Sequence, residues 1–555
     1  MLKKLKCLKF NGVICILSFI YASLFIFGYS IDKDFSFSFI VQNPLMTFMC
    51  FIFVFCTSYV IIANVYTGAF KEYLISITSL EGKKIKNSKI VKGICLLHNA
   101  YEECDAKHNY NIGFIIKFVI ILVVFGVFFL RFYPGVITPD TTEQIGSMFG
   151  IYGLSNHHPI FHTIIIGACL KIGNAIFGSY NAALALYSII QMVLVSLTFS
   201  YVLTYLKKNN CNLWIRSIIL LFFMAFPTNI VFSFTIWKDI PFSLSVLFFI
   251  IYLNKCIKSG NFKFNVSDFV FLCFFALLLM LFRNNGQYLI LFLLIALIFS
   301  KVKQKRIIIT GLTITYIIYI LYLHVLLPNL GVGLAGKQEM LSIPFQQYAK
   351  IANEQEEKLS EDQIYKINEY LDYNTIKKEY NPIISDPVKA TFKKEGYSND
   401  PVGIVKLYFE LFFKFPKESV EAFFSNTYGY WYPFSRNNQG VSRAVYENTL
   451  LDKYNIKRVT IINSEILNKY IGIANFNFPI IGNILSPGVI FDFYLLIIGY
   501  VIYSKRKDKL IIFVPLIALF LTCVAGPVNG CFRYFYALYL CLPFIACSFF
   551  IVDNK

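Results

Sequence analysis

The sequence predicts an all-α polytopic membrane protein, a bundle of about 11–13 transmembrane helices that carries a helical extracytoplasmic domain. Hydrophobic residues make up 57% of the 555-residue chain and charged residues only 15%, whereas a soluble domain has about 25% charged residues. Apolar runs of about 20 residues, the length that crosses a bilayer, recur along the chain, and one long polar segment at 328–486 interrupts them. This composition excludes a soluble enzyme, a disordered protein and a nucleic-acid-binding protein.

The clear membrane-helix candidates are the apolar runs with few charges. They cover residues 10–30, 44–66, 112–132, 181–205, 213–232, 240–255, 307–327, 488–504, 510–526 and 534–551. Two further runs contain polar residues. Segment 160–178 includes Lys171 and Asn174, and segment 268–300 is split by Arg283-Asn-Asn-Gly286.

Basic loops predict the orientation of the bundle, because lysine and arginine collect on the cytoplasmic side of membrane proteins. The basic loops are residues 3–9, 71–107, 207–216, 254–263, 301–306 and 505–509, while acids and bases balance within 328–486. We therefore expect a multi-pass cell-membrane protein with cytoplasmic termini and with 328–486 outside. Because the loops at 254–263 and 301–306 are both basic, segment 268–300 is expected to cross the membrane twice or to enter and return. The loops at 71–107 and 207–216 are also both basic, and helices 112–132 and 181–205 already supply two crossings between them, so 160–178 is expected to be re-entrant or to lie along the outer surface.

Four parts follow from this topology. They are a two-helix membrane extension with a basic cytoplasmic loop at 1–111, a membrane module at 112–327, a mainly helical outer domain at 328–486 and C-terminal membrane helices at 487–555. Helices expected in the outer domain cover 337–353, 360–371, 401–413, 417–424 and 463–473. Ser360-Glu-Asp-Gln363 has the pattern of a capping box, and the phenylalanines between 409 and 424 predict a helix pair at the membrane surface.

The predicted outer loop at 131–159 collects titratable residues. Asp140 follows a proline at an expected helix start, and Glu143 lies one helical turn further on. Alone, these acids would suggest an N-cap and a first-turn carboxylate. His157 and His158 lie nearby, and three of the six histidines fall within 157–162. Because the other outer loops carry few charges, this grouping favours a catalytic carboxylate at the membrane surface.

Three further outer loops carry charges. Lys238 and Asp239 follow a tryptophan and could be solvated loop residues. Arg283 is expected near membrane depth, where a charge is costly and usually faces a cavity or a partner. Arg533 lies in the last outer loop. The convergence of such loops is what a site for an anionic, lipid-attached substrate requires.

Known catalytic signatures for other chemistries do not occur in the sequence. It contains no His-Glu-x-x-His zinc motif, no glycine-rich phosphate loop, no Gly-x-Ser-x-Gly elbow and no Gly-x-Gly-x-x-Gly. His157 and His158 are adjacent, so they point in different directions on a helix or strand, and at most one of them would join His162 as a ligand. Histidine metal binding is therefore not predicted.

At these residues the chain resembles the GT-C superfamily of integral-membrane glycosyltransferases, which includes the protein O-mannosyltransferases and the lipid A aminoarabinose transferases. The resemblance rests on Asp140, His158-Pro159, Trp237-Lys-Asp239, the Arg283-Asn-Asn-Gly286 break and the late polar insert. More closely, the chain is similar to an uncharacterised family of bacterial GT-C-like membrane proteins. The stretches that carry this similarity are 341–347, 381–389, 426–433 and 527–534, and the similarity covers roughly 112–550.

The resemblance implies a GT-C-like bundle and a transferase that takes a sugar from a polyprenyl-phosphate donor. The acceptor would be a glycan, lipid or protein outside the cytoplasmic membrane. The superfamily's first-loop acid maps onto Asp140 and its second-loop acid onto Asp239. Because the first loop reads Asp140-Thr-Thr-Glu143 instead of Asp-x-Asp or Asp-Glu, dependence on a divalent ion, Mg²⁺ or Mn²⁺, stays open.

The residue types match this chemistry. A phosphate leaving group already stabilises negative charge, so the reaction needs a base for the acceptor hydroxyl and cations for the phosphate. Asp140 is the expected base, and Asp239 would position the acceptor or the neighbouring lysine. The expected phosphate ligands are Arg283, Lys238 and Arg533, and the expected secondary acceptor residues are Glu143, His157 and His158. A single displacement would invert the anomeric centre.

Two other classes of function remain as alternatives. A membrane acyltransferase or polysaccharide polymerase would use a histidine or arginine of the outer loops. A lipid or ion transporter would be expected to show internal repeats and charges inside several helices. This chain instead concentrates its polar residues in outer loops, which favours group transfer at one membrane surface.

Overall fold

The structure is a computed structural model that describes residues 10–68, 110–258, 265–436, 449–472 and 486–551. Within these ranges the regular elements are all helices, and the extended segments form isolated bridges instead of sheets. The prediction of an all-α polytopic membrane protein is therefore confirmed. The basic loops at 3–9 and 71–107 lie outside the described residues.

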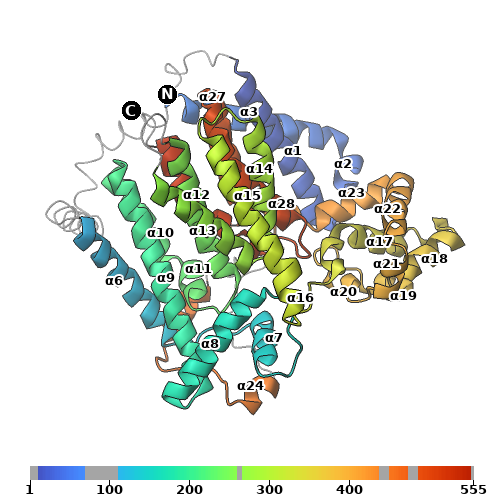
Figure 1. The fold of residues 1–555 in the computed structure, drawn as a ribbon. Helices are drawn as coiled ribbons and strands as arrows, with labels where there is room; N and C mark the ends of the chain where they lie inside the picture. The colour runs from blue at the N-terminus through green and yellow to red at the C-terminus, as the bar shows by residue number, and fades with distance from the viewer. Residues whose placement is uncertain (1–9, 69–109, 259–264, 437–448, 473–485, 552–555) are drawn as a thin grey trace.

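The bundle consists of long apolar helices (Figure 1). Eight described helices are long and apolar enough to cross a membrane. They are α1 (Gly12–Asp34), α3 (Pro44–Tyr66), α6 (Tyr110–Phe129), α8 (Ile160–Phe177), α9 (Tyr180–Lys208), α12 (Asp239–Lys258), α15 (Lys305–Leu321, continued by a π turn at Tyr322–Leu326 and by α16, Leu327–Asn329) and α29 (Phe532–Ala546, continued by a π turn at Cys547–Ile551). A ninth span results if α10 (Leu213–Ala225) and α11 (Pro227–Ser233), which meet at a bend of 53°, count as one.

The described residues contain fewer helices of membrane-spanning length than the expected 11–13, because several apolar runs form shorter helices. The predicted runs at 268–300 and 488–504 form helices of fewer than 18 residues, namely α13 (Val266–Phe282), α14 (Gly286–Phe299) and α27 (Pro487–Tyr503). The run at 510–526 is divided into a 3-10 turn at Lys507–Phe513 and α28 (Val514–Val524), with Pro515 in the first turn of α28. A proline is well tolerated at that position.

A close backbone approach explains the break between α13 and α14. Arg283 adopts an extended conformation and ends α13. A Cβ atom on Gly286 would lie 2.4 Å from the carbonyl oxygen of Leu279, so only glycine permits this tight turn. The Arg-Asn-Asn-Gly sequence is therefore a turn between two helices, at which the arginine leaves the helical backbone.

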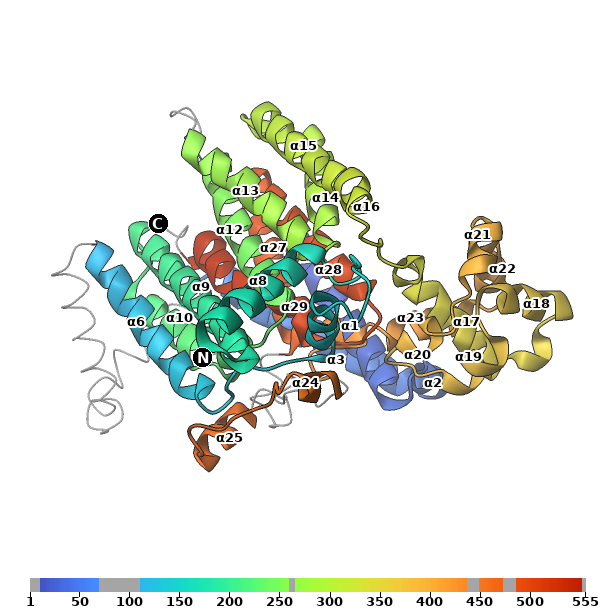
Figure 2. The same ribbon diagram turned by 60° about the horizontal axis from the view of Figure 1, so that its bottom comes forward.

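One end of the bundle carries the short polar helix α7 (Pro139–Met148) together with α8, and we call it the α7 end (Figures 1 and 2). Segment 160–178 forms the continuous helix α8, which ends at Gly178 with a φ of 62° and turns back along α9. Its length and composition suit a membrane span. The re-entrant or outward-lying position expected for it stays a prediction.

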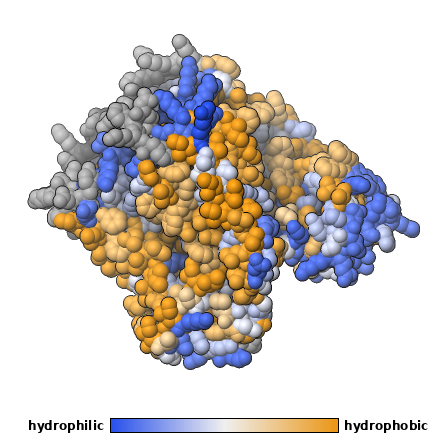
Figure 3. Space-filling view, viewed as in Figure 1, coloured by the Kyte–Doolittle hydropathy of each residue, from blue (hydrophilic) through white to orange (hydrophobic). Residues whose placement is uncertain are grey.

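The polar segment 328–486 contains two structural parts. The first has its own hydrophobic core, which includes Phe345, Tyr348 and Ile367, and stands beside the bundle with a more hydrophilic surface (Figures 2 and 3). Its helices are α17 (Ser342–Glu354), α18 (Glu361–Tyr370), α19 (Tyr373–Glu379), α20 (Asp386–Lys389), α21 (Lys394–Asn399), α22 (Gly403–Lys414) and α23 (Pro416–Ser425). The predicted capping box of Ser360 and Gln363 forms at the start of α18.

The second part, of which residues 426–436 and 449–472 are described, packs into the bundle. Tyr428 and Tyr430 are fully buried in the main core. Helix α24 (Thr449–Lys453) packs against α7, and α25 (Glu465–Gly472) packs against α11. The polar segment thus returns to the α7 end and contributes to its structure.

Candidate functional site

Four segments that are distant in sequence meet at the α7 end: the first turn of α7, the start of α12, the turn between α13 and α14, and the start of α29. Thr138, not Asp140, is the N-cap of α7, since its hydroxyl accepts a hydrogen bond from the backbone of Thr141. Pro139 occupies the first helical turn. Asp140 therefore has no capping function and projects its carboxylate toward the other segments.

Asp140 lies between three basic side chains. Its Oδ2 atom is 3.0 Å from Nη1 of Arg533, 3.5 Å from Nζ of Lys238 and 3.8 Å from Nδ1 of His158. All four side chains are largely buried. The structure thus brings together four residues that the sequence analysis had selected from three different loops.

The cations determine the protonation state of this carboxyl group. Burial alone would raise the pKa of Asp140, but the charges of Lys238 and Arg533 outweigh burial and hold this pKa well below its usual range. Burial also lowers the pKa of Lys238, an effect that Asp140 and Asp239 partly offset. Asp140 is therefore an ionised carboxylate at neutral pH, neutralised by its neighbours.

His158 joins this cluster to Glu143. Lys238 Nζ lies 2.7 Å from His158 Nδ1, and His158 Nε2 lies 2.9 Å from Glu143 Oε2. A lysine ammonium can only donate, so Nδ1 accepts and the ring carries its proton on Nε2, which donates to Glu143. The hydrogen bond with His158 lowers the pKa of Glu143. His158 thus links the two acids by direct contacts.

A second ion pair lies beside the first. Arg283 Nη1 is 3.2 Å from Asp239 Oδ1, and the Arg283 guanidinium lies 4.6 Å from the ring centre of Tyr534. The guanidinium of Arg533 contacts the same ring at 4.9 Å and Trp237 at 5.3 Å. Both guanidinium groups therefore contact the same aromatic ring.

The second pair is incompletely satisfied. Asp239 is only 1% exposed, and among the described residues neither of its carboxylate oxygens accepts a hydrogen bond. Arg283 Nη1 and Trp237 Nε1 likewise form none within the described part of the chain. A buried polar atom without a hydrogen bond costs about 1–3 kcal/mol, so these groups are suited to bind a polar ligand or water.

His162 has a structural position. It is fully buried, with Nδ1 3.1 Å from Gln144 Oε1 and Nε2 2.7 Å from Tyr187 Oη. Gln144 also donates to Thr163 at 2.8 Å. These bonds hold α7 against α8 and α9, and they leave neither ring nitrogen of His162 for a ligand.

Two asparagines position the histidine loop and were not assigned a function from the sequence. Asn156 Nδ2 donates to Asn284 Oδ1 at 3.1 Å, and Asn284 Nδ2 donates to the carbonyl of Asn156 at 2.8 Å. Asn156 Oδ1 accepts from the backbone of Ile160 at the start of α8. The pair ties the loop that carries His157 and His158 to the turn that carries Arg283.

The loop before Arg533 is held by the polar segment. Asn529 Oδ1 accepts from the backbone of Gly429 at 2.7 Å, and the backbone of Asn529 donates to Ile383 at 2.9 Å. The hydroxyl of Tyr430 donates to the carbonyl of Val528 at 2.8 Å. Three of the stretches that carry the family resemblance therefore meet here and position Arg533. They are residues 381–389, 426–433 and 527–534.

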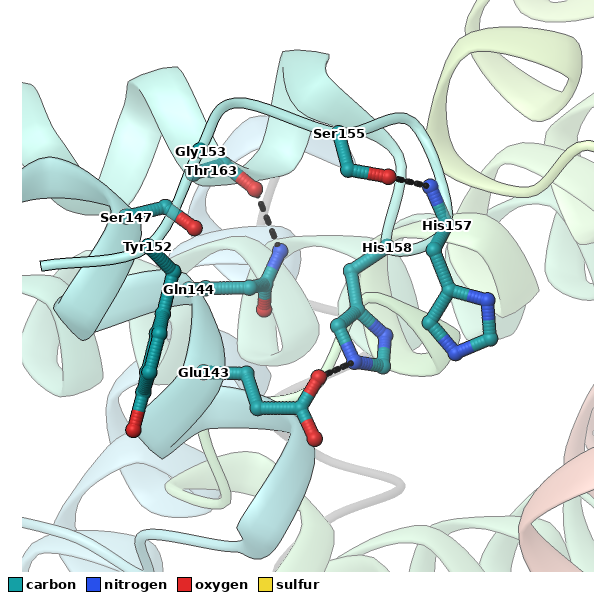
Figure 4. Close-up of a pocket in the computed structure, with 9 residues that line it drawn as sticks. All are labelled: Glu143, Gln144, Ser147, Tyr152, Gly153, Ser155, His157, His158 and Thr163. Carbon is teal, nitrogen blue, oxygen red and sulfur yellow. Dashed lines mark hydrogen bonds and ion pairs between the residues drawn. The ribbon is translucent and has the colours of Figure 1, made fainter. Parts of the chain in front are cut away.

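A polar pocket opens beside the cluster (Figure 4). It has a volume of about 410 Å³. Its lining residues are Glu143, Gln144, Ser147, Tyr152, Gly153, Ser155, His157, His158 and Thr163. Glu143 and His158 belong both to this pocket and to the cluster around Asp140, so a molecule in the pocket would lie next to the charged residues.

The donor set does not fit a resident divalent ion. Among the described residues, no group of three or more His, Cys, Asp or Glu side chains could hold a metal. Asp140 and Asp239 each face a basic side chain instead of a second carboxylate. The acids of the site are therefore arranged to pair with the protein's own cations.

The chain belongs to a family of unknown function (DUF6020), whose model matches residues 151–555. The matched region contains His157, His158, Lys238, Asp239, Arg283 and Arg533, and it begins after Asp140 and Glu143. No curated protein and no solved structure matches the chain.

Proposed function

We propose that this member of the DUF6020 family is a membrane glycosyltransferase of the GT-C type. It would transfer a sugar from a polyprenyl-phosphate donor to an acceptor outside the cytoplasmic membrane. The observation that carries the proposal is the ion-pair cluster at the α7 end, in which Asp140 lies between Lys238 and Arg533, with the Arg283–Asp239 pair beside it.

The charge balance of the cluster suits such a donor. Lys238, Arg283 and Arg533 supply three positive charges, and the two carboxylates that contact them directly, those of Asp140 and Asp239, supply two negative ones, while Glu143 pairs with His158 instead. The phosphodiester of a polyprenyl-phosphate sugar carries one negative charge, which would balance the remaining positive charge. When the bond to the sugar breaks, the phosphate gains negative charge, so the same cations stabilise the transition state more than the ground state.

Asp140 is the proposed base. Its ion pairs keep it ionised but weakly basic. A donor phosphate that attracts Lys238 and Arg533 would weaken these pairs and raise the basicity of the carboxylate only when the substrate is bound. Asp140 then takes the proton of the acceptor hydroxyl, the acceptor oxygen bonds to the anomeric carbon, and the polyprenyl phosphate leaves from the opposite face.

The proposed location follows from the basic loops and the membrane helices. With the basic loops 301–306 and 505–509 in the cytoplasm, both termini are cytoplasmic and the α7 end faces outward. This location suits a donor carried by a membrane lipid and an acceptor that is a cell-surface glycan, lipid or protein.

The test is donor turnover by the full-length protein. The protein is reconstituted in nanodiscs with radiolabelled polyprenyl-phosphate sugars, and the release of polyprenyl phosphate is measured together with the surface glycans of a deletion strain. Donor-dependent transfer that Asp140→Asn abolishes would support the proposal. Failure to consume any polyprenyl-phosphate sugar, together with unchanged surface glycans, would reject it in favour of acyl transfer or transport.

A further inference from the structure

One aromatic side chain beside the charged cluster, that of Tyr152, takes no part in the proposed sugar-transfer step. Tyr152 is 47% exposed on the wall of the pocket. A Cβ atom on Gly146 would lie 2.4 Å from a ring carbon of Tyr152, so the ring rests directly on the backbone of α7 at a glycine. The helix therefore holds the ring in place on one side, while its other side remains open to a ligand.

The polar groups of the pocket lie beside this ring. In Figure 4, Glu143 lies between Tyr152 on one side and the imidazoles of His157 and His158 on the other. Glu143 Oε2 accepts from His158, and the other carboxylate oxygen forms no hydrogen bond among the described residues. His157 has an exposed ring with no hydrogen-bonded nitrogen in the described part of the chain. Both groups are available to an incoming molecule.

We propose that this pocket is the acceptor subsite and that it binds a saccharide, with one sugar ring stacked on Tyr152 and its hydroxyls hydrogen-bonded to Glu143 and His157. A sugar ring presents a C–H-rich face that packs on an aromatic ring, and its edge carries hydroxyls for planar polar groups. The volume of about 410 Å³ lies in the range of small-molecule sites. The proposal rests on the proposed function and specifies its acceptor.

The residues that line the pocket disfavour the donor phosphate and its lipid chain as occupants. The Glu143 carboxylate would repel a phosphate, so the donor's anionic group belongs with the three cations and not in this pocket. A lipid chain would leave the polar groups of Glu143 and His157, which line the pocket, facing hydrocarbon. A saccharide hydroxyl that points from the pocket toward the cluster would give its proton to Asp140, while its oxygen replaces the phosphate oxygen on the anomeric carbon.

Binding can be measured without turnover. The full-length protein in nanodiscs is titrated with methyl glycosides of glucose, galactose and N-acetylglucosamine, and binding is followed by saturation-transfer NMR. We expect the unmodified protein to bind at least one of these glycosides, and Tyr152→Ala to weaken that binding at least about tenfold. Gly146→Ala should weaken it similarly, because the added methyl group displaces the ring although alanine is the better helix former.

The matched control is Tyr365→Ala on α18, a tyrosine that is 66% exposed and far from the pocket in sequence. This control should bind glycosides like the unmodified protein. The proposal is overturned if the unmodified protein binds none of the glycosides, or if Tyr152→Ala binds them as well as Tyr365→Ala does. If glycosides bind at Tyr152 but no polyprenyl-phosphate sugar is consumed, the subsite stands and the proposed transferase function fails.

Discussion

Helix α12 carries one residue of each of two cation clusters, at its opposite ends. At its start, Asp239 pairs with Arg283, whose guanidinium lies 4.6 Å from the ring centre of Tyr534. Near its end, Lys255 pairs with Asp268 at 3.4 Å and lies close to several tyrosine rings. Both clusters thus combine a cation, a carboxylate and aromatic rings.

The two clusters differ in how completely their polar atoms are satisfied. Lys255 also donates to the hydroxyl of Tyr201 at 2.9 Å, and Asp268 accepts from Asn265 at 3.2 Å. Asp239 is buried, accepts no hydrogen bond among the described residues and lies beside a second set of charges. A satisfied pair joins two helices, whereas Arg283 Nη1 and Trp237 Nε1, donors without a hydrogen bond among the described residues, are suited to bind an anion.

We expect the two clusters to lie on opposite sides of the membrane, and this is the largest expected difference between them. Single cysteines are introduced at Glu357, which is exposed between α17 and α18, and at Ser267, which is exposed beside the Lys255 cluster. Ser360 is avoided because it caps α18. In intact cells cleared of other accessible thiols, a membrane-impermeant reagent should label position 357 and should reach position 267 only after lysis. The reverse pattern would overturn the proposed orientation.

Asp140→Asn should have the largest effect on activity. Asparagine keeps the shape and leaves the Thr138 cap intact but cannot accept the proton, so we expect sugar transfer to fall about 10²–10⁴-fold. Lys255→Met at the other end of α12 is the matched control and should transfer at the unmodified rate. If Asp140→Asn retains more than about a tenth of the rate, the base must be sought at Asp239.

Arg283→Ala should lower kcat/KM for the donor by about 10²-fold, because it removes a cation aimed at the phosphate. It also leaves Asp239 buried without its partner, so thermal stability should fall. Arg283→Lys keeps the charge but loses the planar fork, and we expect an intermediate kcat/KM. Full activity in Arg283→Ala would exclude this arginine from the donor site.

Asn529→Ala should act through the position of Arg533. It removes the acceptor for the buried backbone N–H of Gly429, which costs about 1–3 kcal/mol and loosens the loop. We expect the KM for the donor to rise about tenfold with a smaller change in kcat. Asn265→Ala, which loosens the Lys255 cluster, is the control, and an equal change of KM in both variants would contradict a specific positioning role.

The smallest expected effect is that of mild acid. The pKa of Asp140 is held below its usual range, so its ion pairs contribute stability above the unfolded-state pKa of about 3.9 and lose it only as pH falls through the lower folded-state value. Asp140 should therefore cause no decline of kcat/KM between about pH 7 and pH 5. A decline centred near pH 6 would instead identify a histidine as the required proton acceptor.

The pattern of the sequence was enough for the helical membrane architecture and for the choice of charged residues. Long apolar runs have few alternatives to helices in a bilayer, because every backbone polar group must be bonded within the segment. Charges are costly near the membrane, so Asp140, Lys238, Asp239, Arg283 and Arg533 stood out without any knowledge of their contacts. The capping box at Ser360 was visible for a similar reason, since it depends only on residues within one turn.

The pairing of these residues was decided by the tertiary structure. Asp140 and Arg533 are separated by 393 positions, yet they form an ion pair, and no local pattern specifies which acid meets which base. The contact of the Tyr152 ring with Gly146 likewise depends on the path of one loop. The hydrogen bond of Asn529 is a third example, because its partner Gly429 comes from the polar segment. Sequence periodicity reports which residues are buried, but only the packing of distant segments determines which of them touch.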